Sequence, residues 1–322
     1  MQAKRLLKSG LVFLLVFAVL YFPALVFMCK VNFKSKPLIY KTSDIYTLKG
    51  GNSYRKFKEF DKNAKCDLIV VGSSHAYRGY DPRNFSSAGI SMFNLGTSAQ
   101  TPLNSYIITK NYVTNGNCKL VILDVYDGAF HNNGFESSSD LIQNISSNKA
   151  AFEMATSYKN PQILNMLALR FINSSSPVLY QDSLYKGCGY SEKRDTLKYS
   201  LPFDEYENRY LPSDVQIEYL EKLLQYFTTN NIPVIMVTVP FPKEKIVEQH
   251  IIYSKIFTEM ALKYKVQYLD YSFNNNFNSK THFYDSHHLN QSGVNLFNKI
   301  FLDDLDKMDI LKKLHVGAVS RE

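Results

Sequence analysis

The sequence predicts an α/β fold in which helices cover both faces of a parallel sheet, preceded by one N-terminal transmembrane helix. Residues 68–71 are four consecutive apolar residues that run directly into Gly72-Ser73-Ser74. Such a run, bounded by a small-residue turn, is typical of a strand buried inside a parallel sheet. Strand-like and helix-like segments then alternate along the chain, which favours helices on both sides of that sheet. The hydrophobic content of 45% is ample for the core.

The first thirty residues have the composition of a membrane anchor. Residues 10–29 are a stretch of 20 apolar or small residues that follows Lys4, Arg5 and Lys8. In a helix this stretch would rise about 30 Å, the thickness of the hydrocarbon core. A secretory signal peptide has a shorter apolar region and a small-residue cleavage site, and residues 26–30 offer no such site. We therefore expect an uncleaved single-pass anchor rather than a cleaved signal.

The anchor also predicts how the rest of the chain is organised. Residues 1–9 would be a cytoplasmic tail, residues 10–29 the anchor, and residues 30–64, which show no clear period, a juxtamembrane connector. Residues 65–322 would form the main domain. Lysines on both sides of the anchor leave the positive-inside rule indecisive. Since a lone N-terminal anchor usually exports the domain attached to it, we place the main domain outside the cytoplasm, in what we expect to be a bacterial protein.

Strands and helices are expected in regular order within the main domain. Apolar runs predict strands over residues 67–72, 91–96, 119–126, 232–239 and 266–271. Apolar residues at helical spacing predict helices over residues 102–114, 213–230, 243–264 and 290–305, with Ser213 as the N-cap of the second. Residues 130–215 interrupt this order, with helical patterning over residues 148–171 and then a stretch rich in Tyr, Ser, Gly and Pro. We expect an insertion there, which could be a lid, a partner surface or a long excursion.

Charge and motif content exclude several function classes. The net charge of +8 is spread thinly, without a basic stripe and interleaved aromatic residues, so nucleic-acid binding is not expected. The sequence has no metal-ligand spacing, Gly-rich phosphate loop or nicotinamide fingerprint. We therefore expect neither a metal site nor a cofactor.

Two of the four cysteines, Cys66 and Cys118, each stand just before an apolar run. If these runs are neighbouring parallel strands, both thiols lie at the same end of the sheet, within reach of a disulfide bond. An exported domain would permit that bond. The alternative is two unrelated, half-buried thiols.

Ser74 is the candidate nucleophile, because it follows a strand end, the edge where open α/β folds place their sites. A serine hydroxyl is a weak nucleophile unless a base accepts its proton. Far downstream, Asp285 and His288 are three residues apart, so a helical turn or tight loop would put both side chains on one face. The carboxylate could then hold the imidazole Nδ1–H while Nε2 faces the serine. An Asp-x-x-His pair can also be a capped helix start, but its combination with the glycine-serine turn favours a triad.

Three short motifs together resemble the SGNH/GDSL hydrolase superfamily: Gly72-Ser73-Ser74, Asn94-Leu95-Gly96 and Asp285-x-x-His288. Membrane-anchored members related to polysaccharide O-acetylation proteins look most similar. The resemblance covers residues 65–305 apart from the insertion, and it implies a flavodoxin-like three-layer α/β/α sandwich. It implies Ser74 as the nucleophile, with His288 and Asp285 as its partners. It also implies that the backbone N–H groups of Ser74 and Gly96 bind the oxyanion.

The chain departs from the family pattern at two places. Ser73 replaces the aspartate that usually precedes the nucleophile, and we expect it to support the turn. After the third strand, Asp124-Val-Tyr126-Asp127 replaces Gly-x-Asn-Asp, so an oxyanion-binding Asn is missing. Loss of one such donor typically costs about 10²–10³ in rate. Either the Tyr126 hydroxyl or another group substitutes, or the two N–H groups act alone. The candidate pocket residues are His75, which could equally cap a helix or face solvent, and Asn94, Tyr126 and Asp127.

Together, the residues and the resemblance favour an extracytoplasmic serine-dependent acyl-ester enzyme acting on acetylated cell-envelope or exported glycans. With water as the acceptor it would be an esterase, and with a sugar hydroxyl an O-acyltransferase. The expected partners are an acylated carbohydrate substrate, the membrane through residues 10–29 and a membrane protein that donates the acyl group. Two alternatives stay open: a catalytically inactive glycan-binding or assembly protein on the same fold, and a membrane-proximal lipid esterase.

Overall fold

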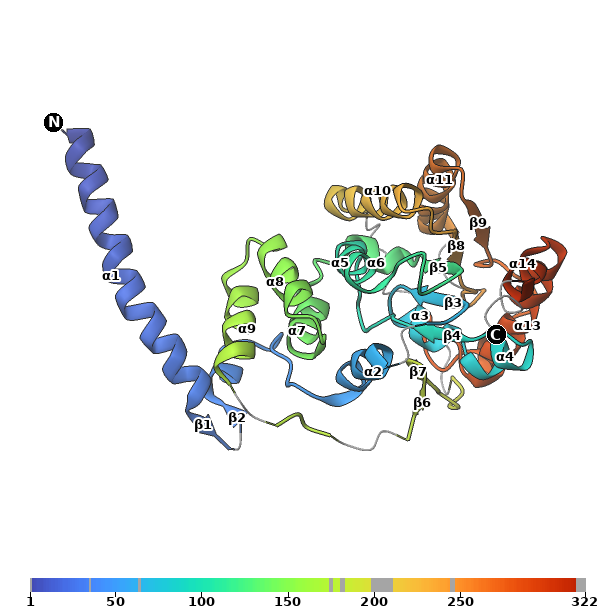
Figure 1. The fold of residues 1–322 in the computed structure, drawn as a ribbon, viewed down its shortest axis with the longest axis horizontal. Helices are drawn as coiled ribbons and strands as arrows, with labels where there is room; N and C mark the ends of the chain where they lie inside the picture. The colour runs from blue at the N-terminus through green and yellow to red at the C-terminus, as the bar shows by residue number, and fades with distance from the viewer. Residues whose placement is uncertain are drawn as a thin grey trace.

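A computed structural model describes residues 2–34, 36–62, 65–173, 176–179, 183–197, 211–243 and 247–316. Its α/β domain follows one long N-terminal helix (Figure 1). The five strands of the main sheet are β3 (Leu68–Val71), β4 (Met92–Asn94), β5 (Leu120–Asp124), β8 (Val234–Thr238) and β9 (Gln267–Asp270). Parts of the expected connector and insertion, the start of the helix expected over residues 243–264 and the end of the predicted domain lie outside the described residues.

Helices and short hairpins make up the remaining elements. The N-terminal part holds α1 (Gln2–Lys30), β1 (Asn32–Phe33), β2 (Lys36–Pro37), η1 (Leu38–Lys41) and α2 (Gly51–Lys62). The middle of the chain holds α3 (Ser74–Gly79), α4 (Pro82–Ser87), α5 (Pro102–Tyr112), α6 (Asp127–His131), α7 (Phe135–Asn144), α8 (Asn148–Ser157), α9 (Pro161–Ile172), β6 (Tyr185–Gly187) and β7 (Tyr190–Ser191). The C-terminal part holds α10 (Asp214–Thr229), α11 (Val247–Tyr264), α12 (Ser279–His282), α13 (Gln291–Lys307) and α14 (Ile310–Val316).

The main sheet confirms the predicted fold class. Its strand order is β4-β3-β5-β8-β9, and every neighbouring pair is parallel. Counted along the chain within this sheet, the order is 2-1-3-4-5, which is that of flavodoxin-like folds. In such a sheet the ligand site lies beyond the carboxyl ends of the strands, at the switch point between the first and third. Here that point lies between β3 and β5.

Helices cover both faces because alternate residues of each buried strand point in opposite directions. Ile69 and Val71 of β3 pack with α2, α5, α10 and α11 in one core cluster. Leu68 and Val70 pack with α3, α4, α13 and α14 in the other. All four side chains of β3 are fully buried, which explains why the strand is a continuous apolar run rather than an alternating one. The result is a three-layer α/β/α arrangement.

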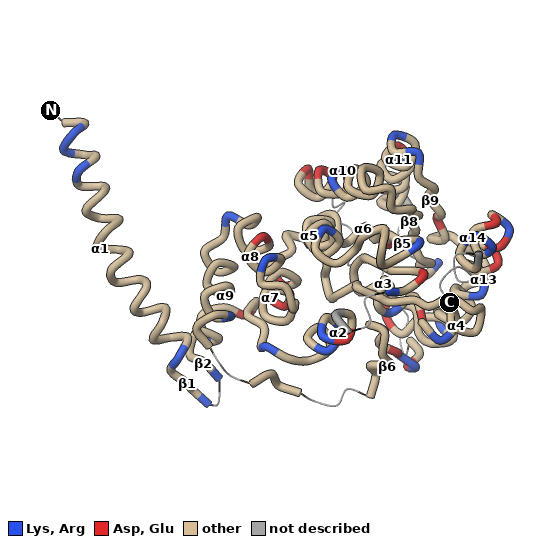
Figure 2. Tube along the Cα trace, viewed as in Figure 1, with Lys and Arg blue, Asp and Glu red and all other residues tan. Residues whose placement is uncertain are grey.

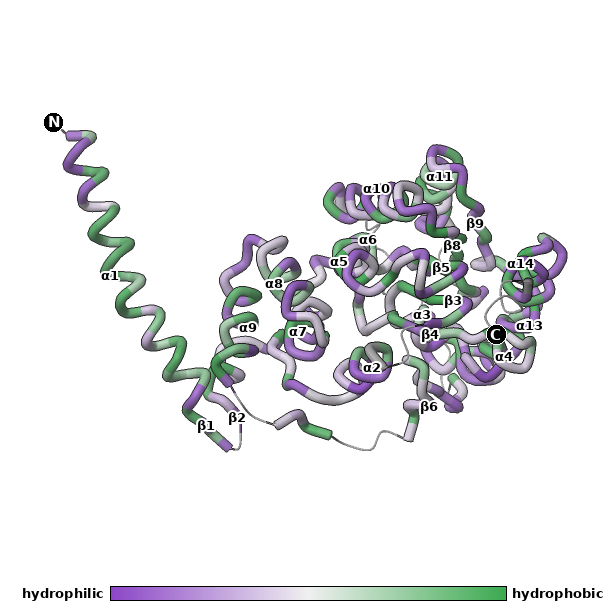
Figure 3. Tube along the Cα trace, viewed as in Figure 1, coloured by the Kyte–Doolittle hydropathy of each residue, from purple (hydrophilic) through white to green (hydrophobic). Residues whose placement is uncertain are grey.

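Helix α1 is long and apolar enough to cross a membrane. Between Lys8 and Lys30 it carries no charged residue, and basic residues stand at both of its ends (Figure 2). Its hydrophobic stretch extends away from the α/β domain (Figure 3). The helix also includes residues 2–9, expected as a tail, and contains Pro23.

The segment expected as a connector contains folded structure next to the sheet. Helix α2 places Phe57 and Phe60 in the core, and the ring of Phe60 lies 4.9 Å from that of Phe93 on β4. The sequence analysis did not identify this helix, because its large hydrophobic residues, Tyr54, Phe57 and Phe60, stand at a three-residue spacing among polar and charged residues. Part of the segment therefore belongs with the α/β domain.

Helices α7, α8 and α9 lie within the predicted insertion and form a group between the sheet and α1 (Figure 1). The helical pattern expected over residues 148–171 is two helices, because Asn160 caps α9 and Pro161 occupies its first turn. Ser213 is the N-cap residue of α10, as expected, but its side chain makes no capping hydrogen bond.

The disulfide bond between Cys66 and Cys118 is not formed, and all four cysteines are free. The Cys118 thiol instead donates to the carbonyl of Thr114, 3.5 Å away in the turn before β5. Burial raises the pKa of both thiols to about 12. Since the thiolate is the reactive form, these buried thiols are poor partners for disulfide exchange.

Candidate active site

Ser74 lies at the carboxyl end of β3, at the switch point of the sheet. Gly72 is needed in the preceding turn, because a Cβ atom there would lie 2.7 Å from the Cβ of Asp124 on β5. Ser73 caps α3, with its Oγ accepting a hydrogen bond of 3.4 Å from the backbone N–H of His75. Ser74 is therefore the first residue of α3, and Ser73 supports the turn as expected.

Asp285, His288 and Ser74 form a continuous chain of hydrogen bonds. His288 Nε2 lies 2.7 Å from Ser74 Oγ, and His288 Nδ1 lies 2.8 Å from Asp285 Oδ2. The other carboxylate oxygen of Asp285 accepts the backbone N–H groups of His287 and His288 at 3.0 and 2.8 Å. The three residues that the sequence analysis selected are thus brought together across more than 200 positions of sequence.

The charge state of Asp285 determines which nitrogen of His288 carries the proton. Burial alone raises the pKa of Asp285, but the hydrogen bond from His288 and the charges of His288 and His287 hold it well below its usual range. An ionised carboxylate can only accept, so in its neutral form the His288 ring carries its proton on Nδ1. Its Nε2 is then an acceptor for the Ser74 hydroxyl, the arrangement of a general base beside a nucleophile.

His75 lies behind the base and does not line the cavity, contrary to its selection as a pocket residue. It is 2% exposed, and its ring stacks on that of His288 at 4.7 Å between centroids and 24° between planes. On the other side its centroid lies 3.7 Å from that of Tyr126. His75 Nε2 lies 2.8 Å from the carbonyl oxygen of His287, so this nitrogen carries a proton and donates. The bond joins the residue after Ser74 to the residue before His288.

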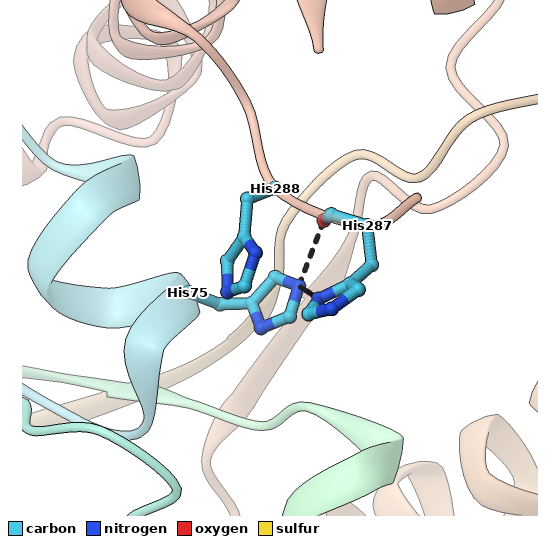
Figure 4. Close-up of side chains that lie close together, drawn as sticks. All are labelled: His75, His287 and His288. Atoms are coloured by element: carbon cyan, nitrogen blue, oxygen red, sulfur yellow. Dashed lines mark hydrogen bonds between the residues drawn. The ribbon is translucent and has the colours of Figure 1, made fainter. Parts of the chain in front are cut away.

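His75, His287 and His288 form a cluster in which one nitrogen atom of each ring lies within 4.8 Å of those of the other two (Figure 4). Three imidazoles at this spacing could be considered as metal ligands. However, both nitrogens of His288 bind within the triad, and the nearly parallel His75 and His288 rings direct their in-plane lone pairs along separate lines. The geometry favours a stacked, hydrogen-bonded cluster over a tetrahedral ligand set.

The backbone N–H of Gly96, expected as an oxyanion donor, already has a partner in this structure. It donates to Asn94 Oδ1 at 2.9 Å, while Asn94 Nδ2 donates to the carbonyl of Ala76 at 2.7 Å. Asn94 is fully buried, so it fixes the β4 loop to α3 and is not a pocket residue. Lys56 of α2 binds the carbonyl of Gly96 from the other side, and burial lowers the pKa of this lysine to about 7.

Tyr126 and Asp127 both line the cavity, as expected, but Asp127 has a structural partner. Its two carboxylate oxygens each lie 3.0 Å from His250 Nδ1, and His250 Nε2 lies 3.0 Å from Asp270. Burial alone would lower the pKa of His250, but the two carboxylates raise it to about 9. A buried, protonated histidine thus joins α11 to the first turn of α6 beside the cavity. The sequence analysis missed it, because the three residues are far apart and form no motif.

Ser74 and His288 open into a cavity of about 380 Å³. Its wall includes Asn132, the C-cap residue of α6, which the sequence analysis did not select. Asn132 Oδ1 accepts the backbone N–H of Gly134 at 2.7 Å. The opposite end of that amide, Nδ2, is therefore the end with N–H groups to donate. No sequence signal marks this residue, since it lies five residues beyond Asp127, the end of the segment that replaces Gly-x-Asn-Asp.

A larger cleft of about 860 Å³ adjoins the cavity. The two share Ser98 and Glu136 as lining residues, and the side chains of this pair lie 3.4 Å apart. The cleft extends to the β1–β2 hairpin at the base of α1, with Tyr40, Tyr46 and Tyr77 among its lining residues. The cleft thus meets the cavity of Ser74 at Ser98 and Glu136.

No family model matches the chain, and no curated protein matches its sequence. Among solved structures, the chain is similar to GDSL-type lipases and esterases. A GDSL-like lipase from Bacteroides thetaiotaomicron VPI-5482 is 11% identical, with 80% of this chain and 100% of that one covered and a TM-score of 0.41. An acetyl xylan esterase, AlAXEase, is 13% identical, with 74% and 99% covered and a TM-score of 0.41.

A lipase/acylhydrolase from Enterococcus faecalis is 12% identical, with 75% and 96% covered and a TM-score of 0.39. Likenesses at these levels carry no information on the substrate of this chain. The chemistry of the site rests on its own residues: a serine, a histidine and an ionised carboxylate in hydrogen-bonded order beside a cavity.

Proposed function

We propose that this protein is a membrane-anchored acyl-ester enzyme of the SGNH type, with Ser74 as its nucleophile. The observation that carries the proposal is the hydrogen-bonded order Asp285, His288, Ser74 at the switch point of a parallel sheet. Such an order activates a hydroxyl that is otherwise a poor nucleophile. The reaction class is acyl transfer from an ester.

In the first step Ser74 Oγ attacks the ester carbonyl while its proton passes to His288 Nε2. The imidazolium that forms is stabilised by Asp285, which accepts its Nδ1–H at 2.8 Å. His288 then returns the proton to the departing alcohol, leaving an acyl group on Ser74. An incoming hydroxyl group takes the acyl group in the second step, and His288 serves again as the base.

The oxyanion requires donors other than the N–H of Gly96. The backbone N–H of Ser74 makes no hydrogen bond among the described residues, and as the first residue of α3 it precedes the helical ladder. We assign the second donor to Asn132 Nδ2, because its oxygen is fixed by Gly134 and its amide lines the cavity. Preorganised donors of this kind are usually a large part of catalysis.

The acyl acceptor and the substrate are parts of the same proposal. We infer that the domain lies outside the cytoplasm and acts on acetylated cell-envelope or exported glycans. The adjoining cleft supports a bulky, extended substrate, since its tyrosines and hydrogen-bonding side chains suit the faces and hydroxyls of sugars. Water as acceptor would release acetate, and a sugar hydroxyl would retain the acetyl group.

A fluorophosphonate probe tests the nucleophile. We expect the wild-type chain and Ser73→Ala to be labelled and Ser74→Ala to be unlabelled. Ser73 is the matched control, because it is the adjacent serine and only caps α3. Equal labelling of Ser74→Ala and wild type would reject Ser74, and no labelling of the wild type would favour an inactive binding protein. The wild-type protein is then incubated with an acetylated oligosaccharide and a second sugar. Free acetate indicates hydrolysis, and acetylation of the second sugar indicates transfer.

A further inference from the structure

Helix α9 has an apolar face that is exposed among the described residues. Leu164 and Phe171 are 46% and 60% exposed. They are seven residues apart, with the half-buried Ala168 between them, so the three side chains form a stripe along one side of the helix. The one charged residue of α9, Arg170, turns inward and donates to the carbonyls of Ile142 and Ile145 at 2.6 and 2.8 Å.

This helix packs against the segment that crosses the membrane in the proposed function (Figure 1). Asn165 of α9 accepts a hydrogen bond from the hydroxyl of Tyr21 on α1 and donates to the hydroxyl of Tyr46 at 3.3 Å. Leu25 and Cys29 of α1 are also buried against the domain. The contacts of α1 with the folded domain thus begin at the middle of its apolar stretch, not at its end.

The position of that contact decides where α9 must lie. The 11 residues from Gly10 to Leu20 precede the contact, and they rise only about 16 Å, roughly half of the ~30 Å hydrocarbon core. Residues 10–20 alone are therefore too short to span the bilayer. If residues 10–29 span the membrane, the part of the domain that touches Tyr21 must enter it.

We propose that α9 is a second membrane-contacting element, with Leu164, Ala168 and Phe171 inserted in the interfacial layer of the bilayer that α1 crosses. Each end of the helix makes a capping hydrogen bond, which lowers the cost of placing it in this layer. Asn160 accepts the N–H of Gln162 at 2.8 Å, and the N–H of Asn173 donates to the carbonyl of Leu169 at 2.9 Å. Interfacial helices bury their apolar face by about 5–10 Å. Tyr21 lies eight residues before Cys29, a rise of about 12 Å, so α9 would lie at the deep limit of that layer.

Basic residues stand where the headgroups would lie. Lys34, Lys36 and Lys41 are exposed on and after the β1–β2 hairpin at the base of α1 (Figure 2). Lysines next to a membrane segment are attracted to anionic headgroups. The large cleft begins at this hairpin, so insertion of α9 would hold the mouth of the cleft close to the membrane surface. The inference rests on the membrane anchorage of the proposed function.

The absence of tryptophan from the chain allows a direct test. A single tryptophan is introduced by Phe171→Trp, with Leu164→Trp as a second variant on the same face. Phe17→Trp in α1 is the positive control, and Leu262→Trp on α11, where the side chain is 74% exposed, is the water-exposed control. Each full-length variant is reconstituted in vesicles of phosphatidylcholine and phosphatidylglycerol, with and without brominated acyl chains. Hydrolysis of a small acetyl ester reports that each variant is folded.

We expect the emission of Phe171→Trp and Leu164→Trp to shift to shorter wavelength and to be lost as brominated lipid is added, as for Phe17→Trp. Leu262→Trp should instead be quenched by acrylamide from the water. Emission at positions 164 and 171 that matches Leu262→Trp would overturn the inference while leaving the anchor intact. Shielding from both quenchers would also overturn it, because another protein surface would then cover the stripe. If Phe17→Trp escapes the brominated lipid, the anchorage itself fails, and the inference with it.

Discussion

Removal of the His75 side chain should slow catalysis although it does not touch the reacting atoms. Its Nε2–H donates to the carbonyl of His287 at 2.8 Å, and its ring stacks on that of His288 at 4.7 Å. Ser74 precedes His75 and His288 follows His287, so these two contacts set the position of the base relative to the nucleophile. Because a small misplacement of reacting groups is costly, their loss should lower kcat.

The two contacts can be given separate magnitudes. One hydrogen bond contributes a net ~0.5–1.5 kcal/mol, which corresponds to about 2- to 13-fold in rate. A stacked pair adds ~0.5–1.5 kcal/mol. His75→Phe keeps the ring and loses the donor, so its kcat should fall about 2- to 13-fold. His75→Ala loses both and should fall about 5- to 150-fold.

Steady-state hydrolysis of p-nitrophenyl acetate measures these effects, with kcat and KM determined separately. We expect the change in kcat, with KM nearly constant, because His75 is not among the residues that line the cavity. His75→Gln retains an N–H donor and should recover part of the loss. A kcat of His75→Phe equal to that of the wild type would refute a positioning role. So would a loss of thermal stability in His75→Ala that accounts for its loss of activity.

The remaining predictions concern four further residues. Asp285→Asn should lower kcat by about 10⁴-fold, because an amide N–H facing Nδ1 would move the His288 proton to Nε2; unchanged kcat on the same ester would exclude the triad. Asn132→Asp, which keeps the shape but lacks donors, should lower kcat by about 10²–10³-fold, and a smaller effect than that of Asn132→Gln would contradict its assignment to the oxyanion. Gly96→Ala should destabilise the fold by about 1–3 kcal/mol, because its Cβ would lie 2.7 Å from that of Ala76; a thermal midpoint equal to that of wild type would oppose this. The pKa of His250 is raised from 6.5 to about 9, so its ion pairs should add about 3 kcal/mol to the free energy of unfolding. This contribution is fully present below pH 6.5 and is lost as the pH rises through about 9. Denaturant unfolding at low and high pH should show this dependence in wild type and not in His250→Phe.

The strands and the triad could be predicted because their signals are local or strongly spaced. Residues 68–71 are apolar at every position since β3 is buried on both faces. Asp285 and His288 are close in sequence. The triad then requires only one further residue, a serine at the end of a strand. Helix α2 gave no such signal, because its lysines and its two phenylalanines make a weak pattern that tertiary contacts complete.

The parts of the site that could not be predicted depend on side-chain direction. Gly96 occupies the expected place in the loop after β4, but its N–H is bound by Asn94, two residues earlier. A local side-chain bond of this kind competes with any ligand for the same donor, and the motif alone does not reveal it. His250 and Asn132 reach the site from α11 and from the end of α6, and their placement follows from the packing of helices rather than from a pattern in the chain.

Rapid acid quenching of the wild-type enzyme during turnover of an acetyl ester, followed by mass spectrometry of its peptides, tests the central claim most directly. The account predicts one acetyl group on the peptide that contains Ser74, with the modified position at Ser74 and not at Ser73. It also predicts that the acetyl group disappears when the ester is exhausted. Turnover with no acetylated peptide, or with the acetyl group on another residue, would contradict a Ser74 nucleophile.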